Sequence, residues 1–517
     1  MYEYNLALRF QRVAAENAQA TALWFAHDQT ILYGDLNRLA NQVARLLLAK
    51  GVKAGDVVCI SGTKTISSLA TVIACLKLGA PYAVLDPHSP VERLGKILST
   101  CEPHIVIGEE SFIDNVRPLG YRTQVLTDSL PPDFSSEDLE ETKEITGTAS
   151  AYIMFTSGST GFPKGAVMTH GNVLNLIEWA KETYSITTAD VLTNVNPLYF
   201  DNSVFDVYAS LFNGARLVPF NRNETRDPGL LVQKVDAAKC TLWFSVPSLL
   251  IFLQTMRAAD GNHLNSIRRF VFGGEGYPKA KLKMLFDAYP AARLFNVYGP
   301  TECTCICSSH QLSSEDFDDL QDLPRLGQIA TNFGFLLLDD SEQPVVAGEI
   351  AELCLLGPNV GRGYYNDAER TAASFVQNPL NPHFKEVIYK TGDLASIDQN
   401  GDLHIHGRKD NQIKHMGYRI ELEEIETALN CLEYVSEAAV LHTNVNGLSR
   451  IVAVIAGDKE AEADKLRQDL KQIIPDYMIP SLFHQVRVLP KNANGKVDRR
   501  TLAQQYLQQE VVKGTVN

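Results

Sequence analysis

The chain has 517 residues, of which 45% are hydrophobic and 21% charged, which excludes wholesale disorder and predicts a globular protein of two or more domains. A formal net charge of −14 argues against a nucleic-acid partner, because that binding needs a basic face to neutralise phosphates. Any phosphate site must therefore be built locally, from main-chain amides and a few cations.

The ends and the most apolar stretch of the chain give no targeting signal. The N-terminus has neither the basic start nor the apolar run of a signal peptide. Residues 68–85 carry Lys77 and are broken at Gly79 and Pro81, so they predict a buried helix followed by a strand and no membrane span. Nine cysteines without framework spacing favour reduced thiols and a cytoplasmic location, with no membrane partner.

Helix and strand signals alternate through residues 1–300. Residues 35–50 place apolar side chains on one helical face, and Gly51 follows as a stop. Short buried strands are predicted at 57–61, 82–86, 216–220, 241–246, 270–274 and 294–299. This alternation predicts parallel sheets covered by helices on both faces.

The pattern changes twice in the second half of the chain. Residues 348–410 are short, β-rich and glycine-punctuated. A compact α+β stretch follows, with helices predicted at 421–430 and 461–474 and strands at 436–443 and 450–457. The predicted fold class is α/β, with a large N-terminal domain of helix-covered sheets, a β-rich subdomain and a small α+β C-terminal domain. We place the boundary at Asp410, which gives domains of 1–409 and 410–517.

The run CTCIC raises the question of a metal site. Alternate spacing along an extended segment would put Cys303, Cys305 and Cys307 on one face. Zinc sites use CxxC spacing or a histidine pair, and neither is present here. We therefore interpret the run as small residues in a buried strand.

The glycine-rich segment TSGSTGFPKG, residues 156–165, predicts a phosphate cradle. Hydroxyl donors, glycines that let the main chain approach a phosphate, and one mobile cation share this loop: Thr156, Ser157, Ser159, Thr160, Gly158, Gly161 and Lys164. Gly165 follows the lysine, where a Walker A loop has serine or threonine. Pro163 fixes a geometry that a flexible linker does not need, which favours a nucleotide site of another kind over a solvated turn.

A second polar segment, NVYGPTE (296–302), directly follows a predicted strand, where open α/β sheets bind ligands. Asn296 could hydrogen-bond the exocyclic amine of a purine, and Tyr298 could stack on its ring. Gly299 opens a tight turn, and Glu302 could hold a Mg²⁺ that bridges phosphates. Alone, the segment is equally compatible with an ordinary Gly-Pro turn.

Two later segments complete a possible nucleotide site. In YKTGDL, Asp393 follows a strand, and its carboxylate could accept both ribose hydroxyls, while Arg408 in GRKD could reach the ribose or a phosphate. In NANGKVDRR, Lys496 lies on an Asn-Gly turn. Taken singly, these strings are equally compatible with solvated turns and a hairpin tip.

These strings in this order resemble the adenylate-forming superfamily, which contains acyl-CoA synthetases, luciferases and the amino-acid adenylation domains of nonribosomal peptide synthesis. The resemblance covers essentially the whole chain. The strings LCLLGPNVGRGYYND (353–367), KDNQIKHMGYRIELEEIE (409–426) and LPKNANGKVDR (489–499) resemble the amino-acid adenylation branch in particular.

The resemblance implies a two-step reaction with ATP and Mg²⁺. A carboxylate attacks the α-phosphate to give an acyl-adenylate and pyrophosphate, and a thiol then attacks the mixed anhydride. In this scheme the glycine-rich loop offsets phosphate charge, Glu302 is the metal ligand, and Thr301 and Lys496 serve the α-phosphate. Asp410 is the hinge about which a mobile C-terminal domain swings. Met416 stands where the family usually has arginine, so no phosphate or pantetheine contact carries over to that position.

The string LYFDNSVFDVYASL (198–211) bears on the substrate class. Asp201 matches the aspartate that pairs with the substrate's α-ammonium group in amino-acid adenylation domains, although it could also be a surface N-cap. A fatty or aryl acid has no such cation, and an unpaired buried carboxylate would be costly.

The remaining pocket positions, by motif matching, are neutral: Asn202, Phe205, Phe244, Val271, Gly273, Val297, Cys305 and Ile306. Charged side chains are therefore disfavoured as substrates. Two phenylalanines leave room for a small neutral or cyclic side chain, and L-proline is our best single prediction, while Asn202 keeps a small polar side chain open.

We expect no condensation domain before residue 1 and no carrier domain after residue 517, since the tail has no phosphopantetheine attachment string. We therefore expect the thiol acceptor to be a separate carrier protein. Two alternatives stay open: an acyl- or aryl-CoA ligase of the same fold, and a non-catalytic adenylate-binding protein.

Overall fold

The computed structural model describes residues 3–25, 29–127, 134–158, 162–321, 323–331, 333–445, 448–457, 461–491 and 497–507. The chain divides into two compact units. The first unit comprises Met1–Pro87, Leu98–Phe155 and Gly165–Lys409, and the second comprises His88–Ile97, Thr156–Lys164 and Asp410–Asn517. Within the described ranges, no helix combines the length and apolarity that crossing a membrane requires.

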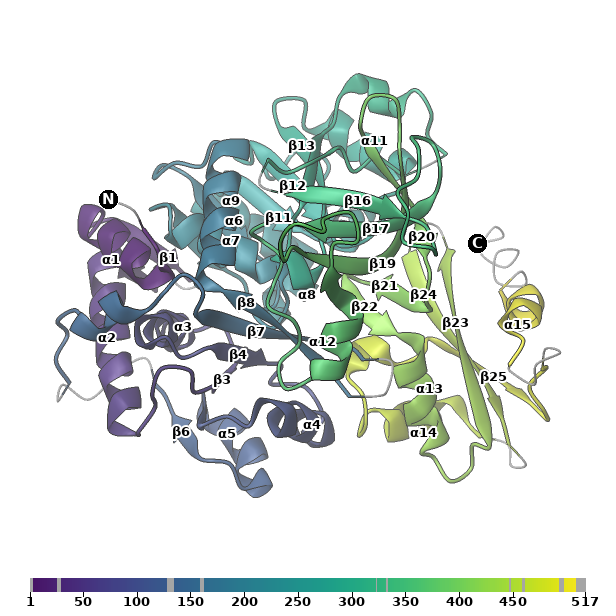
Figure 1. Cartoon of the computed structure of the whole chain (residues 1–517), viewed down its shortest axis with the longest axis horizontal. Helices are drawn as coiled ribbons and strands as arrows, with labels where there is room; N and C mark the ends of the chain where they lie inside the picture. Colours follow the sequence, from purple (N-terminus) through teal and green to yellow (C-terminus); the bar gives the residue numbers. More distant parts are fainter. Residues whose placement is uncertain are drawn as a thin grey trace. The chain divides into compact units, whose positions relative to one another are not determined.

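A six-stranded sheet lies near the start of the first unit (Figure 1). Its strands, in spatial order, are β6 (Thr123–Val125), β5 (Ile105–Gly108), β3 (Val58–Ser61), β4 (Tyr82–Leu85), β7 (Ser150–Thr156) and β8 (Lys164–Thr169). The pairings from β6 to β7 are parallel, and β3, β4 and β5 are buried along their whole length. Burial on both faces is what continuous apolar runs such as VCIS produce.

Five α-helices of the described ranges occur in the same part of the chain as the first strands of this sheet. They are α1 (Leu6–Glu16), α2 (Tyr33–Ala49), α3 (Ile66–Leu78), α4 (Val91–Cys101) and α5 (Glu110–Val116). Thr65 caps α3, since its side chain accepts a hydrogen bond from the amide of Ser68, and Gly79 ends the helix in the left-handed conformation. Every residue of α3 is buried, as its apolar sequence predicts.

The larger sheet of the first unit has nine strands. In spatial order they are β15 (Gln328–Ile329), β14 (Ser308–Gln311), β13 (Arg293–Tyr298), β12 (Arg269–Gly273), β11 (Leu242–Ser245), β9 (Val191–Asn194), β10 (Arg216–Pro219), β1 (Thr21–Trp24) and β2 (Thr30–Leu32). The strands from β13 to β1 pair in parallel, and β14, β15 and β2 are antiparallel. The predicted strands agree with these bounds to within about a residue at each end, as the assignment of element ends allows.

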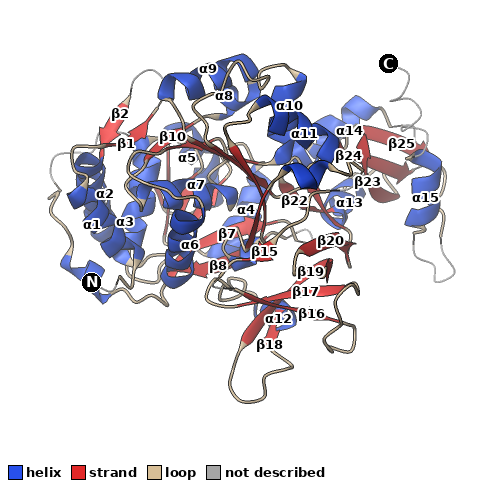
Figure 2. Ribbon diagram, turned by 90° about the horizontal axis from the view of Figure 1, so that it is seen from above, coloured by secondary structure: helices blue, strands red, loops and turns tan. Residues whose placement is uncertain are grey.

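The register of this sheet gives it two different apolar faces. Phe244, Val271 and Phe295 lie side by side on β11, β12 and β13 and belong to one buried cluster, whereas Trp243 and Phe270 belong to another. Helices α6 (His170–Thr183) and α7 (Asn202–Leu211) pack on the first face, and α9 (Pro228–Ala238), α10 (Pro247–Thr255) and α11 (Lys279–Ala288) on the second (Figure 2). A short helix, α8 (Arg222–Arg226), follows β10.

The β-rich part of the first unit is an antiparallel sheet. Its strands are β16 (Gly334–Leu338), β17 (Ala351–Leu356), β19 (Val387–Ile397), β18 (Phe375–Gln377) and β20 (Leu403–Arg408), and α12 (Ala368–Ser374) lies between β17 and β18 in the chain. This confirms the β-rich pattern predicted for residues 348–410.

The second unit contains the α+β elements predicted after Asp410. They are β21 (Gln412–His415), β22 (Tyr418–Glu421), α13 (Leu422–Asn430), β23 (Glu437–Val445), β24 (Leu448–Ala456), α14 (Ala463–Leu470), β25 (Leu482–Val486) and α15 (Arg499–Tyr506). Apolar side chains of α13, α14 and the three-stranded sheet form its core. The mixed α/β fold class predicted from the sequence is confirmed.

Candidate active site

Most of the predicted site residues of the first unit lie at the carboxyl ends of parallel strands in the nine-stranded sheet. Strands β9, β11, β12 and β13 end at Asn194, Ser245, Gly273 and Tyr298. Open α/β sheets bind ligands at this edge because neighbouring strand ends and the loops that follow them converge there. These predicted residues therefore lie at the edge of the sheet where open α/β folds bind ligands.

Asp201 connects two of these loops. It occupies the position before α7, but its side chain makes no capping hydrogen bond to that helix. Instead, the Thr301 hydroxyl donates to Asp201 Oδ2 over 2.6 Å, and Asp201 is half-buried. The alternative reading of Asp201 as a helix cap is therefore not supported, and a carboxylate lies where α7 meets the turn after β13.

The apolar pocket residues predicted from the sequence gather in one buried cluster: Phe205, Phe244, Val271, Val297, Cys305 and Ile306. The rings of Phe205 and Phe244 meet edge to face, with their centroids 4.9 Å apart. Gly273 packs tightly against β13, because a Cβ there would lie 2.3 Å from the carbonyl oxygen of Val297. Asn202, the first residue of α7, is half-buried.

The cysteine run differs from the prediction. Residues 301–303 form a 3₁₀ turn, and Thr304 and Cys305 have positive φ angles of 61° and 72°. Cys303 and Cys307 consequently join the apolar cluster of the β-rich sheet, whereas Cys305 joins the pocket cluster. The three thiols are buried as predicted, but the expectation of one extended strand with all three on one face is wrong. No group of three or more metal-ligating side chains occurs among the described residues.

Gly299 explains this local path. A Cβ at that position would lie 2.2 Å from the carbonyl oxygen of Cys305 and 2.7 Å from Cα of Ile306. Only glycine allows the chain after the turn to pack so closely against the end of β13. Cys305 and Ile306 belong to the same buried cluster as Phe205 and Phe244.

Glu302 is completely buried beside this turn. The Tyr364 hydroxyl donates to Glu302 Oε1 over 2.7 Å, and the amide of Gly361 donates to the Glu302 carbonyl over 2.9 Å. A carboxylate oxygen suits Mg²⁺, which prefers hard oxygen ligands and keeps few protein ligands when it also binds phosphates. The residue present therefore fits a metal ligand. Tyr364 is not among the site residues predicted from the sequence, although it and Glu302 both lie in strings that carry the resemblance.

Asp393 connects β13 with the β-rich sheet. The Tyr298 hydroxyl donates to Asp393 Oδ2, and Arg408 Nη1 donates to Asp393 Oδ1 over 2.6 Å. Asp393 and Arg408 face each other on β19 and β20, so the strand register brings the pair together. Burial raises the pKa of Tyr298 well above its ordinary value, and the Asp393 carboxylate raises it further. Tyr298 therefore stays protonated and remains a hydrogen-bond donor.

The side chain of Asn296 makes hydrogen bonds to main-chain carbonyl groups. Its Nδ2 donates to the carbonyl oxygens of Arg325 and Pro324, over 2.9 and 3.4 Å. Both amide protons are thereby used, which leaves the side-chain oxygen as the atom able to accept a hydrogen bond from a purine amine.

The glycine-rich loop falls mostly in the second unit. The Ser157 hydroxyl donates to the carbonyl of Arg419 over 2.6 Å, and Lys164 Nζ lies 3.7 Å from Glu421 Oε1. Burial raises the pKa of Glu421, and the charges of Lys164 and Arg419 oppose that rise. Gly158 is buried, and Thr156 Oγ1 is buried without a hydrogen-bond partner in the described part of the chain. An unused buried hydroxyl fits the predicted phosphate cradle.

Four of the predicted site residues lie outside the described residues: Ser159, Thr160, Gly161 and Lys496. Met416 is exposed and has a φ angle of 52°. The predicted hinge, Asp410, precedes β21.

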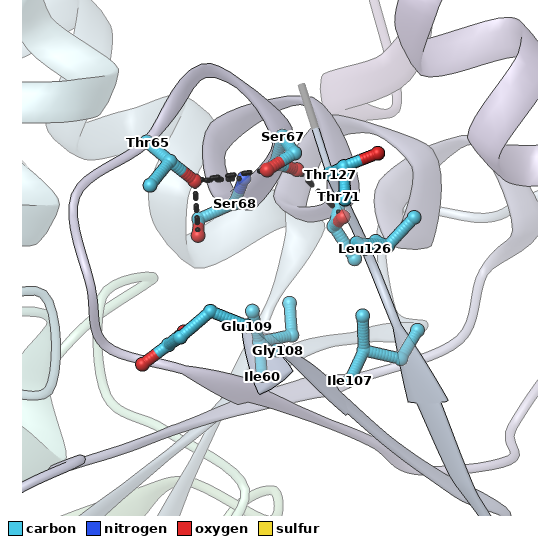
Figure 3. Close-up of a pocket in the computed structure, with 10 residues that line it drawn as sticks. All are labelled: Ile60, Thr65, Ser67, Ser68, Thr71, Ile107, Gly108, Glu109, Leu126 and Thr127. Atoms are coloured by element: carbon cyan, nitrogen blue, oxygen red, sulfur yellow. Dashed lines mark hydrogen bonds between the residues drawn. The ribbon is translucent and has the colours of Figure 1, made fainter. Parts of the chain in front are cut away.

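A separate cavity lies in the six-stranded sheet. It has a volume of about 130 Å³ and is bounded by the ends of β3, β5 and β6 and by the first turns of α3 (Figure 3). Its polar lining includes the hydroxyls of Thr65, Ser67, Ser68 and Thr71. Thr65 Oγ1 lies 2.9 Å from Ser67 Oγ and 2.8 Å from Ser68 Oγ, so these hydroxyls satisfy one another. None of the predicted site residues lines this cavity.

Comparison with known proteins gives two family matches that together span most of the chain. The model of the AMP-binding enzyme family matches residues 10–365, and the model of the AMP-binding enzyme C-terminal domain matches residues 424–496. Bacitracin synthase 3 of Bacillus licheniformis is 32% identical over 95% of this chain, and surfactin synthase subunit 2 of Bacillus subtilis is 32% identical over 95%. The chain spans only 8% and 13% of the lengths of these relatives.

Solved structures agree at the level of the fold. Holo-PA1221, described as a nonribosomal peptide synthetase protein with adenylation and PCP domains, is 25% identical, covers 97% of this chain and 84% of its own, and has a TM-score of 0.84. The Vibrio cholerae adenylation domain AlmE, solved with glycyl-adenosine-5′-phosphate, is 22% identical, covers 98% of this chain and 99% of its own, and has a TM-score of 0.83.

Proposed function

The chain belongs to the family of AMP-binding enzymes, and on that premise we propose that it activates the carboxylate of a small neutral amino acid as an aminoacyl adenylate. ATP is the second substrate, and pyrophosphate is released. The aminoacyl group then passes to the phosphopantetheine thiol of a separate carrier protein. The chain is thus an AMP-forming ligase in the same class of chemistry as the adenylation domains that it resembles.

The observation that carries this proposal is the position of Asp201. Asp201 directly precedes α7, whose residue Phe205 belongs with Phe244 to one buried apolar cluster, and a hydroxyl donates to the Asp201 carboxylate. An α-ammonium group would complete an ion pair there, with a charge-assisted hydrogen bond. A fatty or aryl acid would offer no cation and would leave the carboxylate against apolar atoms.

The pocket also limits the size of the substrate side chain. Phe205 and Phe244 are fully buried and in ring contact, so they fill space that a larger side chain would need. The six apolar lining residues carry no charge, which disfavours acidic and basic amino acids. L-proline is the single substrate that we propose first, and the half-buried Asn202 supports a small polar side chain as the second choice.

Thr301 connects the amino-acid and nucleotide sites in this proposal. Its one hydroxyl proton is donated to Asp201. When the hydroxyl donates instead to the α-phosphate of ATP, Asp201 is released, and the α-ammonium group takes the place of the lost donor. Filling of the phosphate site and filling of the ammonium site would then favour each other.

The remaining polar residues act on the nucleotide. Asn296 accepts from the purine amine, and Asp393, held by Tyr298 and Arg408, accepts from the ribose. Thr156, Ser157 and Lys164 bind the phosphates that leave, together with Ser159 and Thr160 of the same loop. Glu302 would hold Mg²⁺, which neutralises phosphate charge when it is bound.

The C-terminal residues supply the last group. We propose that 1–409 contains the two substrate sites and that 410–517 is a mobile domain hinged at Asp410. Lys496 contacts the substrate carboxylate and the α-phosphate in the first step. A carrier with a phosphopantetheine arm is supported as the partner by the relatives, among them PA1221 with its adenylation and PCP domains.

Amino-acid-dependent ATP–pyrophosphate exchange tests this function. Small neutral amino acids should support exchange, charged amino acids and fatty or aryl acids should not, and Lys496→Ala should abolish it. Exchange only with acids that lack an amine would replace the proposal by an acyl- or aryl-CoA ligase. Unchanged exchange by Lys496→Ala would remove the role assigned to that lysine. Loading of a carrier protein supplied in trans then tests the second step.

A further inference from the structure

A buried polar cluster adjoins Phe205 and Phe244, the two aromatic residues of the proposed pocket. Asp206, one residue after Phe205 on α7, is completely buried and has no role in the chemistry above. Asn194 at the end of β9 and Asn196 just beyond it both donate to Asp206 Oδ2, over 2.8 and 3.0 Å. Asn196 Nδ2 also donates to the carbonyl oxygen of Phe244 over 3.0 Å.

Among the residues that the structure describes, two oxygen atoms in this cluster have no hydrogen-bond donor. They are Asp206 Oδ1 and Asn194 Oδ1, both buried, in two side chains that are already joined by the other ends of their planar groups. An ionised carboxylate oxygen that is buried without a donor is costly. A proton on Asp206 Oδ1 changes that atom into a donor, and the candidate acceptor is Asn194 Oδ1, because the other end of the Asn194 amide already donates to Asp206. One proton therefore satisfies both atoms.

The nearby cation does not supply the missing hydrogen bond. Lys64 Nζ, from the loop after β3, donates to the carbonyl oxygens of Asn194 and Phe220, over 2.6 and 2.8 Å, and its charge acts on Asp206 only from a distance. The other charged group that acts on Lys64 is Glu224 on α8, which is paired with Lys234. Burial raises the pKa of Asp206 to about 7 and lowers the pKa of Lys64 to about 7.

We propose that Asp206 is a neutral carboxylic acid that donates its proton to Asn194 Oδ1, and that this acid–amide pair positions the walls of the amino-acid pocket. The hydrogen bonds of the pair connect α7, which carries Phe205, to the end of β9. Asn196 bonds both Asp206 and the Phe244 carbonyl, and so connects the pair to the end of β11. The second half of the proposal rests on the proposed function, whereas the protonation of Asp206 does not. Asp206 acts through Phe205 and Phe244 and is a positioning residue.

The protonation is tested by thermal unfolding of wild type and Asp206→Asn across pH. Asparagine has the shape of the neutral acid, carries no charge, and places an N–H donor where the acid has its O–H. A carboxyl whose pKa is raised on folding stabilises the protein below its unfolded pKa, near 4, and loses that contribution as pH rises through its folded pKa. The variant should therefore gain stability relative to wild type between about pH 4 and about pH 7.

Asp316 provides a matched control, because it is a buried carboxyl whose pKa is lowered on folding instead of raised. It is also buried, but it accepts hydrogen bonds from Ser313, His310 and Arg325, and these donors hold its pKa below the ordinary value. Relative to wild type, Asp316→Asn should lose stability as pH rises from the lowered folded pKa of Asp316 to about 4, and the deficit should stay constant above that pH. If Asp206→Asn behaves like Asp316→Asn, Asp206 is ionised and the proposal is wrong.

The positioning is tested by exchange kinetics at pH 7. Asp206→Asn should keep KM for the amino acid within about twofold of wild type, whereas Asp206→Leu should raise it tenfold or more without changing KM for ATP. If the leucine variant does not fold, Asn196→Ala, which releases Phe244 but keeps Asp206, should raise the same KM. Unchanged KM in these variants overturns the positioning role. If no amino acid supports exchange, the proposed function fails, and the unfolding experiment still decides the protonation.

Discussion

Replacement of Asp201 should weaken amino-acid activation by about two orders of magnitude. Two unit charges 4 Å apart at an effective dielectric constant of about 20 attract by about 4 kcal/mol. Asp201 is half-buried, so solvent screening reduces this to about 3 kcal/mol, which corresponds to about a 100-fold loss in kcat/KM. The loss should fall on binding of the amino acid, since the α-ammonium group keeps its charge throughout the reaction.

Asp201→Asn and Asp201→Ala separate charge from packing. Asparagine keeps an oxygen that accepts from the Thr301 hydroxyl, whereas alanine removes the contact. Amino-acid-dependent ATP–pyrophosphate exchange at varied amino-acid concentration should show similar losses for both variants, with KM for ATP little changed. Thermal unfolding should change by about 1 kcal/mol or less for the asparagine variant, so that the kinetic effect is not a folding effect.

A des-amino analogue of the best substrate provides the decisive control. Wild type should discriminate against the analogue by about the factor that Asp201→Asn loses, and the variant should discriminate against it far less. This is a double-mutant cycle across the protein and its ligand. If Asp201→Asn retains wild-type kcat/KM for the amino acid, charge at this position is not what selects the substrate, and the assignment of an amino-acid substrate loses its main support.

Three further substitutions test other parts of the structure. Gly273→Ala forces a Cβ to within 2.3 Å of the Val297 carbonyl, so unfolding should occur at lower temperature by the equivalent of about 1–3 kcal/mol; an unchanged Tm would contradict this packing. Tyr298→Phe leaves buried Asp393 without one donor, and exchange at varied ATP should show a raised KM for ATP, beside a loss of about 1–3 kcal/mol in stability. Burial lowers the pKa of His170 to about 4, so this histidine costs stability as pH falls from about 6.5 to about 4, and in thermal unfolding His170→Gln should gain stability relative to wild type over that range.

Local sequence patterns predict much of the scaffold because they act over short distances. The helix predicted at 35–50 is α2 (Tyr33–Ala49), and the strand predicted at 241–246 is β11 (Leu242–Ser245). Alternation and apolar runs of this kind reflect burial, which the final fold does not alter. The edge of the sheet that carries the polar residues also follows from the pattern, since parallel strands share their carboxyl edge.

The partners within the site were not predictable in the same way. Tyr364 lies 62 positions from Glu302 and Thr301 lies 100 positions from Asp201, and no local pattern fixes such pairs. The cysteine run shows a second limit. Alternate spacing predicts one face only for extended backbone, and the close approach permitted by Gly299 puts Cys305 in a left-handed conformation instead.

Three carboxylates of the candidate site share one feature, which bears on how the site takes up its ligands. Asp201, Glu302 and Asp393 each accept a hydrogen bond from a hydroxyl, of Thr301, Tyr364 and Tyr298 respectively. A hydroxyl orients a carboxylate and offsets part of its desolvation without cancelling its charge, as an ammonium or guanidinium would. At each of the three carboxylates the hydroxyl thus helps to fix the orientation of the oxygen atoms. Asp393, which is paired with Arg408 as well, is the site expected to bind a neutral group, the ribose.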